Sequence, residues 1–85
     1  MPVSPALPDL HTRIVAALTE ARRTAKLRQV DLAARLGWPQ PYVSRYETGE
    51  RLLGVDEYVL VARAIGIDPV DLLGQVLASG YDGQD

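Results

Sequence analysis

The sequence contains no cysteine and no phenylalanine, and it has only one histidine and one tryptophan. Without cysteine the chain can form neither a disulfide nor a thiolate metal site. Without phenylalanine the core must be built mainly from leucine, valine, alanine and isoleucine, with one tryptophan and four tyrosines as its aromatic residues. A cysteine-free chain fits a reducing compartment, so we expect a cytoplasmic protein.

Long apolar runs are also missing. No run approaches the roughly eighteen consecutive apolar residues that a membrane-spanning helix needs. The first ten residues, MPVSPALPDL, lack the basic segment and the apolar segment of a signal peptide. We therefore expect no membrane partner.

Patterns typical of catalysis are absent as well. The sequence shows no glycine-rich cofactor loop, no Ser-His-Asp arrangement and no spacing that would hold a metal. The single histidine, His11, is expected at the surface near the start of a helix, where it has no neighbouring metal ligand. A chain of 85 residues also leaves little room for a substrate cleft. We expect no enzyme, no cofactor, no metal and no small-molecule substrate.

Length and local composition predict one folded domain. A chain of this size buries its core incompletely, so a partner subunit could add stability. Residues 1–8 contain three prolines and little charge, which is typical of a flexible lead. We expect the domain to span residues 9–78, and residues 79–85 to form a flexible acidic tail.

The most informative stretch is residues 29–49, which contains two short helical patterns joined by a tight turn. In the first pattern Leu32 and Leu36 lie one helical turn apart, with Ala33 beside them. Gly37 follows at the position where a helix ends on a residue with positive φ. A small residue at a helix crossing and a glycine at the corner favour two helices packed at a steep angle.

The second pattern presents two different faces. Val43 and Tyr46 lie three residues apart and therefore share an inner face. Pro39 and Pro41 flank its start, and proline is tolerated in the first turn of a helix. A polar ridge is expected on the outer face, made by Gln40, Ser44 and Arg45.

Together these positions resemble the helix-turn-helix of the phage-repressor and Cro-like (XRE-type) family. The resemblance covers about residues 14–77 and is best over residues 29–49 and 64–67. It implies an all-α, compact five-helix bundle of the lambda-repressor-like type. An ordinary helical hairpin inside a bundle is the alternative.

The resemblance implies that the second helix reads bases in the major groove. A glutamine amide such as that of Gln40 can pair with adenine, and the planar fork of Arg45 can pair with guanine. Ser44 and Tyr42 are adjacent candidates, and the Tyr42 hydroxyl is far enough from its Cα to reach either a base or a phosphate oxygen. Pro41 stands where many relatives present a polar base reader, and we expect it to contact a thymine methyl group.

Phosphate contacts are expected from residues around this helix. Arg28 takes the place where the family usually has a capping serine or threonine, which loses a cap worth about 1 kcal/mol but adds a cation. Gln29 resembles the family glutamine that binds a phosphate and reaches the next helix. The full expected set is Arg22, Arg23, Arg28, Gln29, Tyr42, Thr48 and Arg51.

Glu47 is a carboxylate at the end of a helix that should face DNA, where the helix dipole and the phosphates both oppose it. It therefore needs a nearby cation. The resemblance pairs this glutamate with Arg22, and we expect an ion pair that docks the first helix onto the recognition helix.

The remaining helices are predicted at residues 9–26, 55–65 and from Pro69 onward. Gly54 and Asp68 are the expected N-terminal caps. The last helix is apolar on more than one stripe, and a small domain seldom exposes so much apolar surface without a partner. We expect a homodimer patch made by Leu52, Leu53, Pro69, Val70, Leu73, Val76 and Leu77.

Charge is unevenly distributed along the chain. The net charge is −2, but residues 21–63 carry eight basic and five acidic residues, and four aspartates follow Gly66. A basic motif beside an acidic end would orient the motif toward phosphates.

We expect a sequence-specific, double-stranded DNA-binding transcriptional regulator, a repressor acting as a homodimer on a pseudo-palindromic operator. Activation through polymerase stays open. The alternative is a protein-interaction module or antitoxin that uses the same fold and binds a protein partner.

Overall fold

A computed structural model describes residues 6–81, with side chains for residues 10–79. The described part contains five α-helices, a short π-helix at the end, and no strand. The predicted all-α, five-helix fold is therefore confirmed. The elements are α1 (Ala6–Thr24), α2 (Gln29–Leu36), α3 (Gln40–Thr48), α4 (Val55–Ile65), α5 (Pro69–Val76) and η1 (Leu77–Tyr81).

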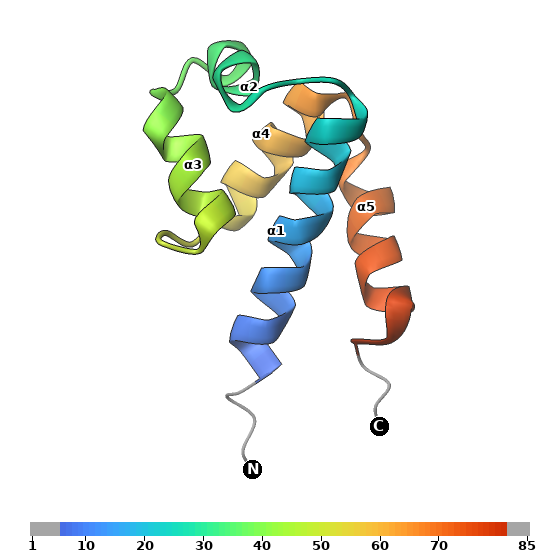
Figure 1. The fold of residues 1–85 in the computed structure, drawn as a ribbon. Helices are drawn as coiled ribbons and strands as arrows, with labels where there is room; N and C mark the ends of the chain where they lie inside the picture. The colour runs from blue at the N-terminus through green and yellow to red at the C-terminus, as the bar shows by residue number, and fades with distance from the viewer. Residues whose placement is uncertain (1–5, 82–85) are drawn as a thin grey trace.

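The helices form two groups that share one core. The helices α1 and α5 lie side by side, and α4 packs against α1, α2 and α5 (Figure 1). The helices α2 and α3 pack closely on each other, and α3 lies at the edge of the molecule. None of the helices within residues 6–81 has the length and apolar character that a membrane crossing requires.

The core draws on every helix. Its largest fully enclosed side chains are Leu18 of α1, Leu32 of α2, Val43 and Tyr46 of α3, and Val61 of α4. Leu72 of α5 is also buried. Three of these, Leu32, Val43 and Tyr46, are among the inner positions predicted from the sequence. Leu36, also predicted there, is half-buried and packs against the same core, so the periodicity of the motif identifies its buried face correctly.

The turns of the motif depend on residues with left-handed backbone. Gly37 ends α2 with a φ of 72°, as predicted, and its amide donates to the carbonyl oxygens of Ala33 and Ala34. Lys26 closes α1 in the same conformation, with a φ of 64°, although it carries a side chain. A non-glycine residue in this region costs about 1 kcal/mol or more, so this turn stores some strain.

The limits of the domain differ from the sequence prediction. The helix α1 begins at Ala6 rather than at Asp9, because Pro8 is compatible with the first turn of a helix. At the other end η1 continues to Tyr81, beyond Ser79 where we expected a flexible tail. An Arg13 guanidinium Nη2 donates to Ser79 Oγ at 2.7 Å and fixes this end to α1. Residues 1–5 of the predicted lead and residues 82–85 of the predicted tail lie outside the described part.

Two predicted caps are present. Asp68 accepts hydrogen bonds from the amides of Val70 and Asp71, at 2.8 and 3.3 Å, and so caps α5. Gly54 occupies the N-cap of α4, and its amide donates to Glu57 Oε1 at 2.9 Å. Both helices therefore begin where the sequence predicted.

His11 differs from its prediction as a surface residue. It is half-buried, and its Nε2 accepts a hydrogen bond of 3.0 Å from the backbone amide of Leu53. This contact connects the start of α1 to the segment between α3 and α4, although the two residues are 42 positions apart in the sequence. Spacing along the chain gives no sign of such a partner.

Candidate nucleic-acid interface

The outer side of α3 carries an accessible polar ridge. No other element covers it in Figure 1. The side chains of Gln40, Pro41, Tyr42 and Arg45 are exposed, and Ser44 is half-buried. Pro39 is the N-cap of α3 and Pro41 lies in its first turn, so both prolines fit without breaking the helix. The predicted base readers therefore lie on one outward face.

Arg45 is the most available cation on this ridge. Its side chain is exposed and forms no hydrogen bond or ion pair with any residue of the described part. Its backbone carbonyl accepts from the amide of Glu50 and from the hydroxyl of Thr48, which fixes the end of α3. The guanidinium is thus free to bind outside the molecule while its backbone is held firmly.

Gln40 belongs to a chain of hydrogen bonds that runs back to α1. Its amide Nε2 donates to Gln29 Oε1 at 2.9 Å, and Gln29 Nε2 donates to Glu47 Oε1 at 2.8 Å. Glu47 in turn accepts from Arg22 Nε at 2.7 Å and from Arg22 Nη2 at 3.0 Å. The amide plane of Gln40 is therefore oriented by the residues behind it.

The Arg22–Glu47 ion pair predicted from the sequence is present and almost fully enclosed. The two side chains are only 9% and 6% exposed, and Arg22 Nη1 donates to the carbonyl oxygen of Leu27. The hydrogen bond to Glu47 raises the pKa of Arg22 above its usual value. Because the guanidinium is enclosed and its charge is paired inside the molecule, the structure argues against the predicted phosphate contact of Arg22.

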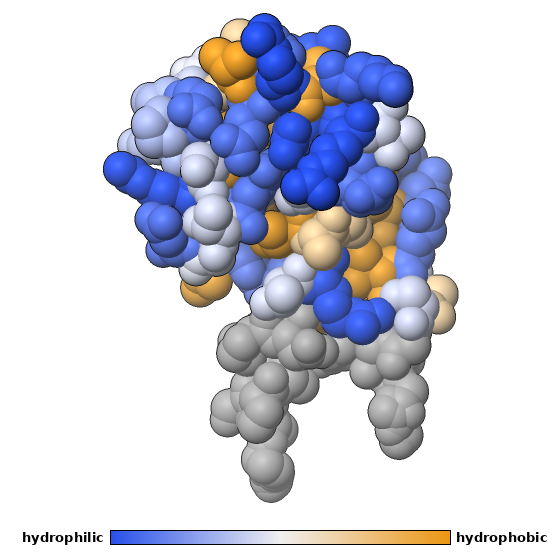
Figure 2. Space-filling view, in the orientation of Figure 1, coloured by the Kyte–Doolittle hydropathy of each residue, from blue (hydrophilic) through white to orange (hydrophobic). Residues whose placement is uncertain are grey.

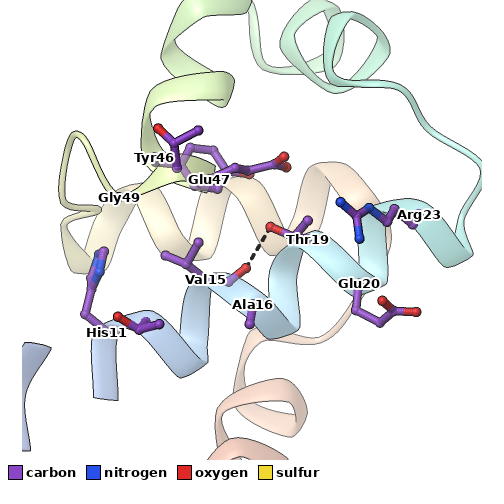
Figure 3. Close-up of a pocket in the computed structure, with 11 residues that line it drawn as sticks. His11, Val15, Ala16, Thr19, Glu20, Arg23, Tyr46, Glu47 and Gly49 are labelled. Atoms are coloured by element: carbon purple, nitrogen blue, oxygen red, sulfur yellow. Dashed lines mark hydrogen bonds between the residues drawn. The ribbon is translucent and has the colours of Figure 1, made fainter. Parts of the chain in front are cut away.

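Tyr46 lies beside this ion pair. It is fully buried, and its hydroxyl has no hydrogen-bond partner in the described part. Burial raises the pKa of Tyr46 well above its usual range, so the phenol stays neutral. A hollow of about 390 Å³ lies between α1 and the end of α3. Tyr46 and Glu47 line it from one side, and Val15 and Thr19 from the other (Figure 3).

Arg28 is held by a residue that the sequence analysis missed. Asp31 Oδ2 accepts from the backbone amide of Arg28 at 2.8 Å and from its Nε at 3.0 Å, and Asp31 Oδ1 accepts from Nη2 at 2.9 Å. These hydrogen bonds lower the pKa of Asp31 to about 2. The carboxylate satisfies the amide of the N-cap residue, which is one half of a capping box, whereas the Arg28 side chain offers no acceptor for the other half. An acid three residues after a helix N-cap is a recognisable signal for this arrangement.

Arg51 does not lie on the outer ridge as a free phosphate clamp. Its Nη2 donates to Glu57 Oε2 at 2.8 Å, and its Nη1 donates to Glu57 Oε1 and to the Leu52 carbonyl. The hydrogen bond from Arg51 lowers the pKa of Glu57. Most donors and the charge of Arg51 are satisfied internally, which argues against the predicted phosphate contact. Glu57 was not identified from the sequence.

The other expected phosphate ligands are placed at the surface. Arg23 and Thr48 are exposed, whereas Gln29 is half-buried within the hydrogen-bond chain already described. Lys26, which the sequence analysis did not assign, is exposed in the turn after α1. Figure 2 shows mostly hydrophilic side chains over the upper part of the molecule, where α2 lies in Figure 1, and apolar surface lower down, between α1 and α5.

The predicted dimer patch is only partly a surface. Leu52 and Val70 are 69% and 76% exposed, and Leu77 is also exposed. Val76 was wrongly included, because its side chain lies in the core at 6% exposure. Val55, which was not predicted, is the most exposed large apolar residue of the described part at 83%. Pro69, Leu53 and Leu73 are half-buried, and the last two line a hollow of about 140 Å³ together with His11, Ile14, Gly54, Val55 and Tyr58.

Comparison with known proteins agrees with this geometry. A helix-turn-helix family model matches residues 18–72, which include the C-terminal end of α1, the whole motif and the first half of α5. The chain belongs to the XRE-type helix-turn-helix family. A solved structure of an XRE-family like protein from Pseudomonas syringae pv. tomato str. DC3000 is 43% identical, with a TM-score of 0.80. The match covers 82% of this chain and 85% of that one. No curated protein sequence matches the chain.

Family membership explains the placement of the motif. XRE-type domains are DNA-binding transcription regulators, and double-stranded DNA is the partner that the helix-turn-helix fold implies. The exposed ridge of α3 corresponds to the recognition helix of this motif. The tight α2–α3 turn and the enclosed Arg22–Glu47 pair hold it at the edge of the domain.

Proposed function

We propose that this XRE-type domain is a sequence-specific transcriptional repressor that binds a pseudo-palindromic operator as a homodimer. The observation that carries the proposal is the outward ridge of α3, on which the Arg45 guanidinium is exposed and has no partner in the described part. A buried or paired arginine at this position would not support base reading.

The ridge offers donors and acceptors suited to base edges. Arg45 has the geometry to pair with the O6 and N7 of guanine, and the Gln40 amide can pair with adenine. The hydrogen bond from Gln40 to Gln29 supports this role, because it limits the orientations that the amide can adopt. Ser44 and Pro41 complete the predicted reading surface.

Phosphate contacts would fix the domain on the duplex. Arg23, Arg28 and Thr48 are exposed around the two ends of the motif, and Lys26 adds a further cation in the turn after α1. Such contacts set register and affinity but carry no sequence information themselves.

Dimerisation would place two recognition helices on one face of the duplex. Exposed Leu52, Val55 and Val70, together with the neighbouring hollow, form an apolar surface away from the ridge of α3. Two-fold pairing through this surface would put the two α3 helices in successive major grooves, about 34 Å apart. Binding at a promoter would then repress transcription by occluding polymerase.

Selection of bound fragments from randomised duplex DNA tests the proposal. We expect enrichment of an inverted repeat whose half-sites are one helical turn apart, with an affinity that falls steeply with salt. Absence of binding to any fragment at low salt would contradict the proposal and favour a module that binds another protein through the same fold. Enrichment of a single half-site would retain DNA reading but contradict the homodimer.

A further inference from the structure

Arg51 lies in the segment between α3 and α4 and connects three parts of the molecule. Its guanidinium lies 5.9 Å from the centre of the Trp38 ring, in the α2–α3 turn, and 5.3 Å from the centre of the Tyr42 ring, in the first turn of α3. The same guanidinium forms a two-point ion pair with Glu57 of α4.

Arg51, Trp38, Tyr42 and Glu57 form a cluster, and the ion pair gives this cluster a defined geometry. The carboxylate of Glu57 also accepts from the amide of Gly54, so it is fixed at the start of α4. Arg51 Nη1 donates to the carbonyl oxygen of Leu52, and its Nε is buried without a hydrogen-bond partner. The plane of the guanidinium is therefore set by Glu57 and by the two rings. Arg51 has little freedom to turn toward a ligand.

Tyr42 is the member of the cluster that reaches the recognition surface. It is 42% exposed and directly follows Gln40 and Pro41, two of the proposed base readers. Its ring is tilted by 57° to that of Trp38, with 6.3 Å between the ring centres. An exposed tyrosine on a helix would ordinarily sample several rotamers. Contact with a cation on one side and an indole on another restricts that sampling.

We propose that Arg51 is a positioning residue for DNA recognition, which fixes the Tyr42 ring at the start of α3 and thereby contributes to the choice of operator sequence. The proposal rests on the DNA-binding function proposed above. Arg51 acts through Tyr42 and does not touch DNA. An operator whose bases contact the tyrosine binds more tightly when the ring is already oriented, because less side-chain freedom is lost on binding. An operator that lacks this base contact gains nothing, so the difference in affinity between the two increases.

A double-mutant cycle with Arg51→Lys and Tyr42→Ala tests this role. Lysine keeps the charge but loses the planar fork that pairs with Glu57 and stacks on the rings. We expect Arg51→Lys to reduce the ratio of affinities for the selected operator and for one altered in the bases next to the start of α3. The expected reduction is about fivefold, the size of one to two cation–π contacts. In the Tyr42→Ala background the same change should alter the ratio by less than about twofold.

The matched control is Arg63→Lys, at an exposed arginine near the end of α4. It should leave the affinity ratio unchanged. Trp38 is the only tryptophan, so its emission reports on the cluster directly. Arg51→Lys should shift that emission, whereas Arg63→Lys should not.

The outcomes separate the proposals. Failure of the wild-type protein to bind any DNA would overturn the DNA-binding function and, with it, the positioning role of Arg51. If the unchanged protein binds but Arg51→Lys weakens all sequences equally, Arg51 is a phosphate contact and the positioning role is wrong. Equal effects of Arg51→Lys with and without the Tyr42 ring would also overturn it. Should Arg51→Lys fail to fold, Glu57→Gln must reproduce the loss of discrimination, and an unchanged ratio there would refute the proposal.

Discussion

Glu47 lies near the end of the recognition helix, where both the helix dipole and DNA phosphates disfavour a negative charge. Its carboxylate accepts three hydrogen bonds, two from Arg22 and one from Gln29. The charge is therefore compensated inside the molecule, and the carboxylate serves to attach α3 to α1 and α2.

Glu47→Ala should destabilise the fold strongly. The substitution leaves the Arg22 guanidinium enclosed without its counter-charge, and breaking such a pair costs about 3 kcal/mol. Chemical denaturation measures the difference. Glu50→Ala, at an exposed acid nearby, is the control and should change stability by less than about 0.5 kcal/mol. Equal unfolding free energies for the Glu47 variant and the unchanged protein would show that the pair contributes nothing.

Arg45→Ala should abolish the preference for guanine at the position that Arg45 reads and leave thermal unfolding unchanged. The side chain has no partner within the described part, so its removal costs the fold nothing. Loss of one bidentate base contact should reduce discrimination by about 1 to 3 kcal/mol. Affinities for the operator and for a variant with the guanine replaced provide the measurement. A uniform loss on both duplexes would assign Arg45 to a phosphate.

Acid should weaken the start of α2 through Asp31. Its pKa in the folded protein is about 2, below its ordinary value of 3.8, so the unfolded chain binds more protons between these values. The stabilisation is present above the ordinary pKa and is lost as pH falls through the folded pKa. The melting temperature of the unchanged protein should thus fall more steeply between pH 4 and pH 2 than that of Asp31→Asn. Parallel curves for the two proteins would exclude this contribution.

At the scale of elements, short helices are fixed by how they end. The helix α2 has only eight residues, which is too short to be stable alone, and its length is set by Arg28 and Asp31 at one end and Gly37 at the other. The α2–α3 turn then leaves only Gly37, Trp38 and Pro39 between the helices. The direction of α3 therefore depends on the backbone of one glycine.

Two glycine substitutions separate backbone conformation from packing. An added Cβ meets no atom within 4 Å at Gly37 or at Gly74, so neither change creates a clash. Gly37→Ala should destabilise by about 1 kcal/mol, because alanine disfavours the left-handed region. Gly74→Ala lies within α5 and should stabilise by about 0.5 to 1 kcal/mol, because alanine favours the helix. Unfolding curves for both variants test the two predictions. Changes of the same sign in the free energy of unfolding would contradict them.

The sequence was sufficient to predict the five helices and the buried face of the motif. Local signals such as Gly37, Asp68 and the spacing of Val43 and Tyr46 report on contacts within a few residues. Pairing between distant side chains was harder to predict. For example, Arg51 was expected to bind a phosphate. Its contacts with Glu57 and with the two rings form only when the loop folds, so the sequence did not reveal them. The ion pair of Glu47 could be anticipated only through the family resemblance.

For the whole molecule, the distribution of exposed apolar side chains predicts its assembly. The sequence alone placed Val76 in the dimer patch, although its side chain is buried. A helix with several apolar stripes does not reveal from its sequence which stripe faces the core. The packing of α5 on α1 decides the question. Leu72 and Val76 are buried, and Val70 remains outside.

Leu52→Asp should weaken dimerisation at least about tenfold, because it places a charge in the proposed apolar interface. Val70→Asp should act similarly. Leu60→Asp is the control, since Leu60 is 53% exposed on α4 and lies outside the proposed patch. Sedimentation at micromolar concentration measures the association. A monomeric unchanged protein under these conditions would mean that pairing requires DNA.

Because the outer ridge of α3 contributes little to the core, the residues that meet DNA can be exchanged separately from those that hold the fold. Pro41 and Arg45 are exposed, whereas the residues that fix the helix lie on its inner face. Substitution at such positions should redirect the domain to new target sites with little change in the free energy of unfolding. The same scaffold could therefore diversify into regulators of different genes without passing through unstable ancestors.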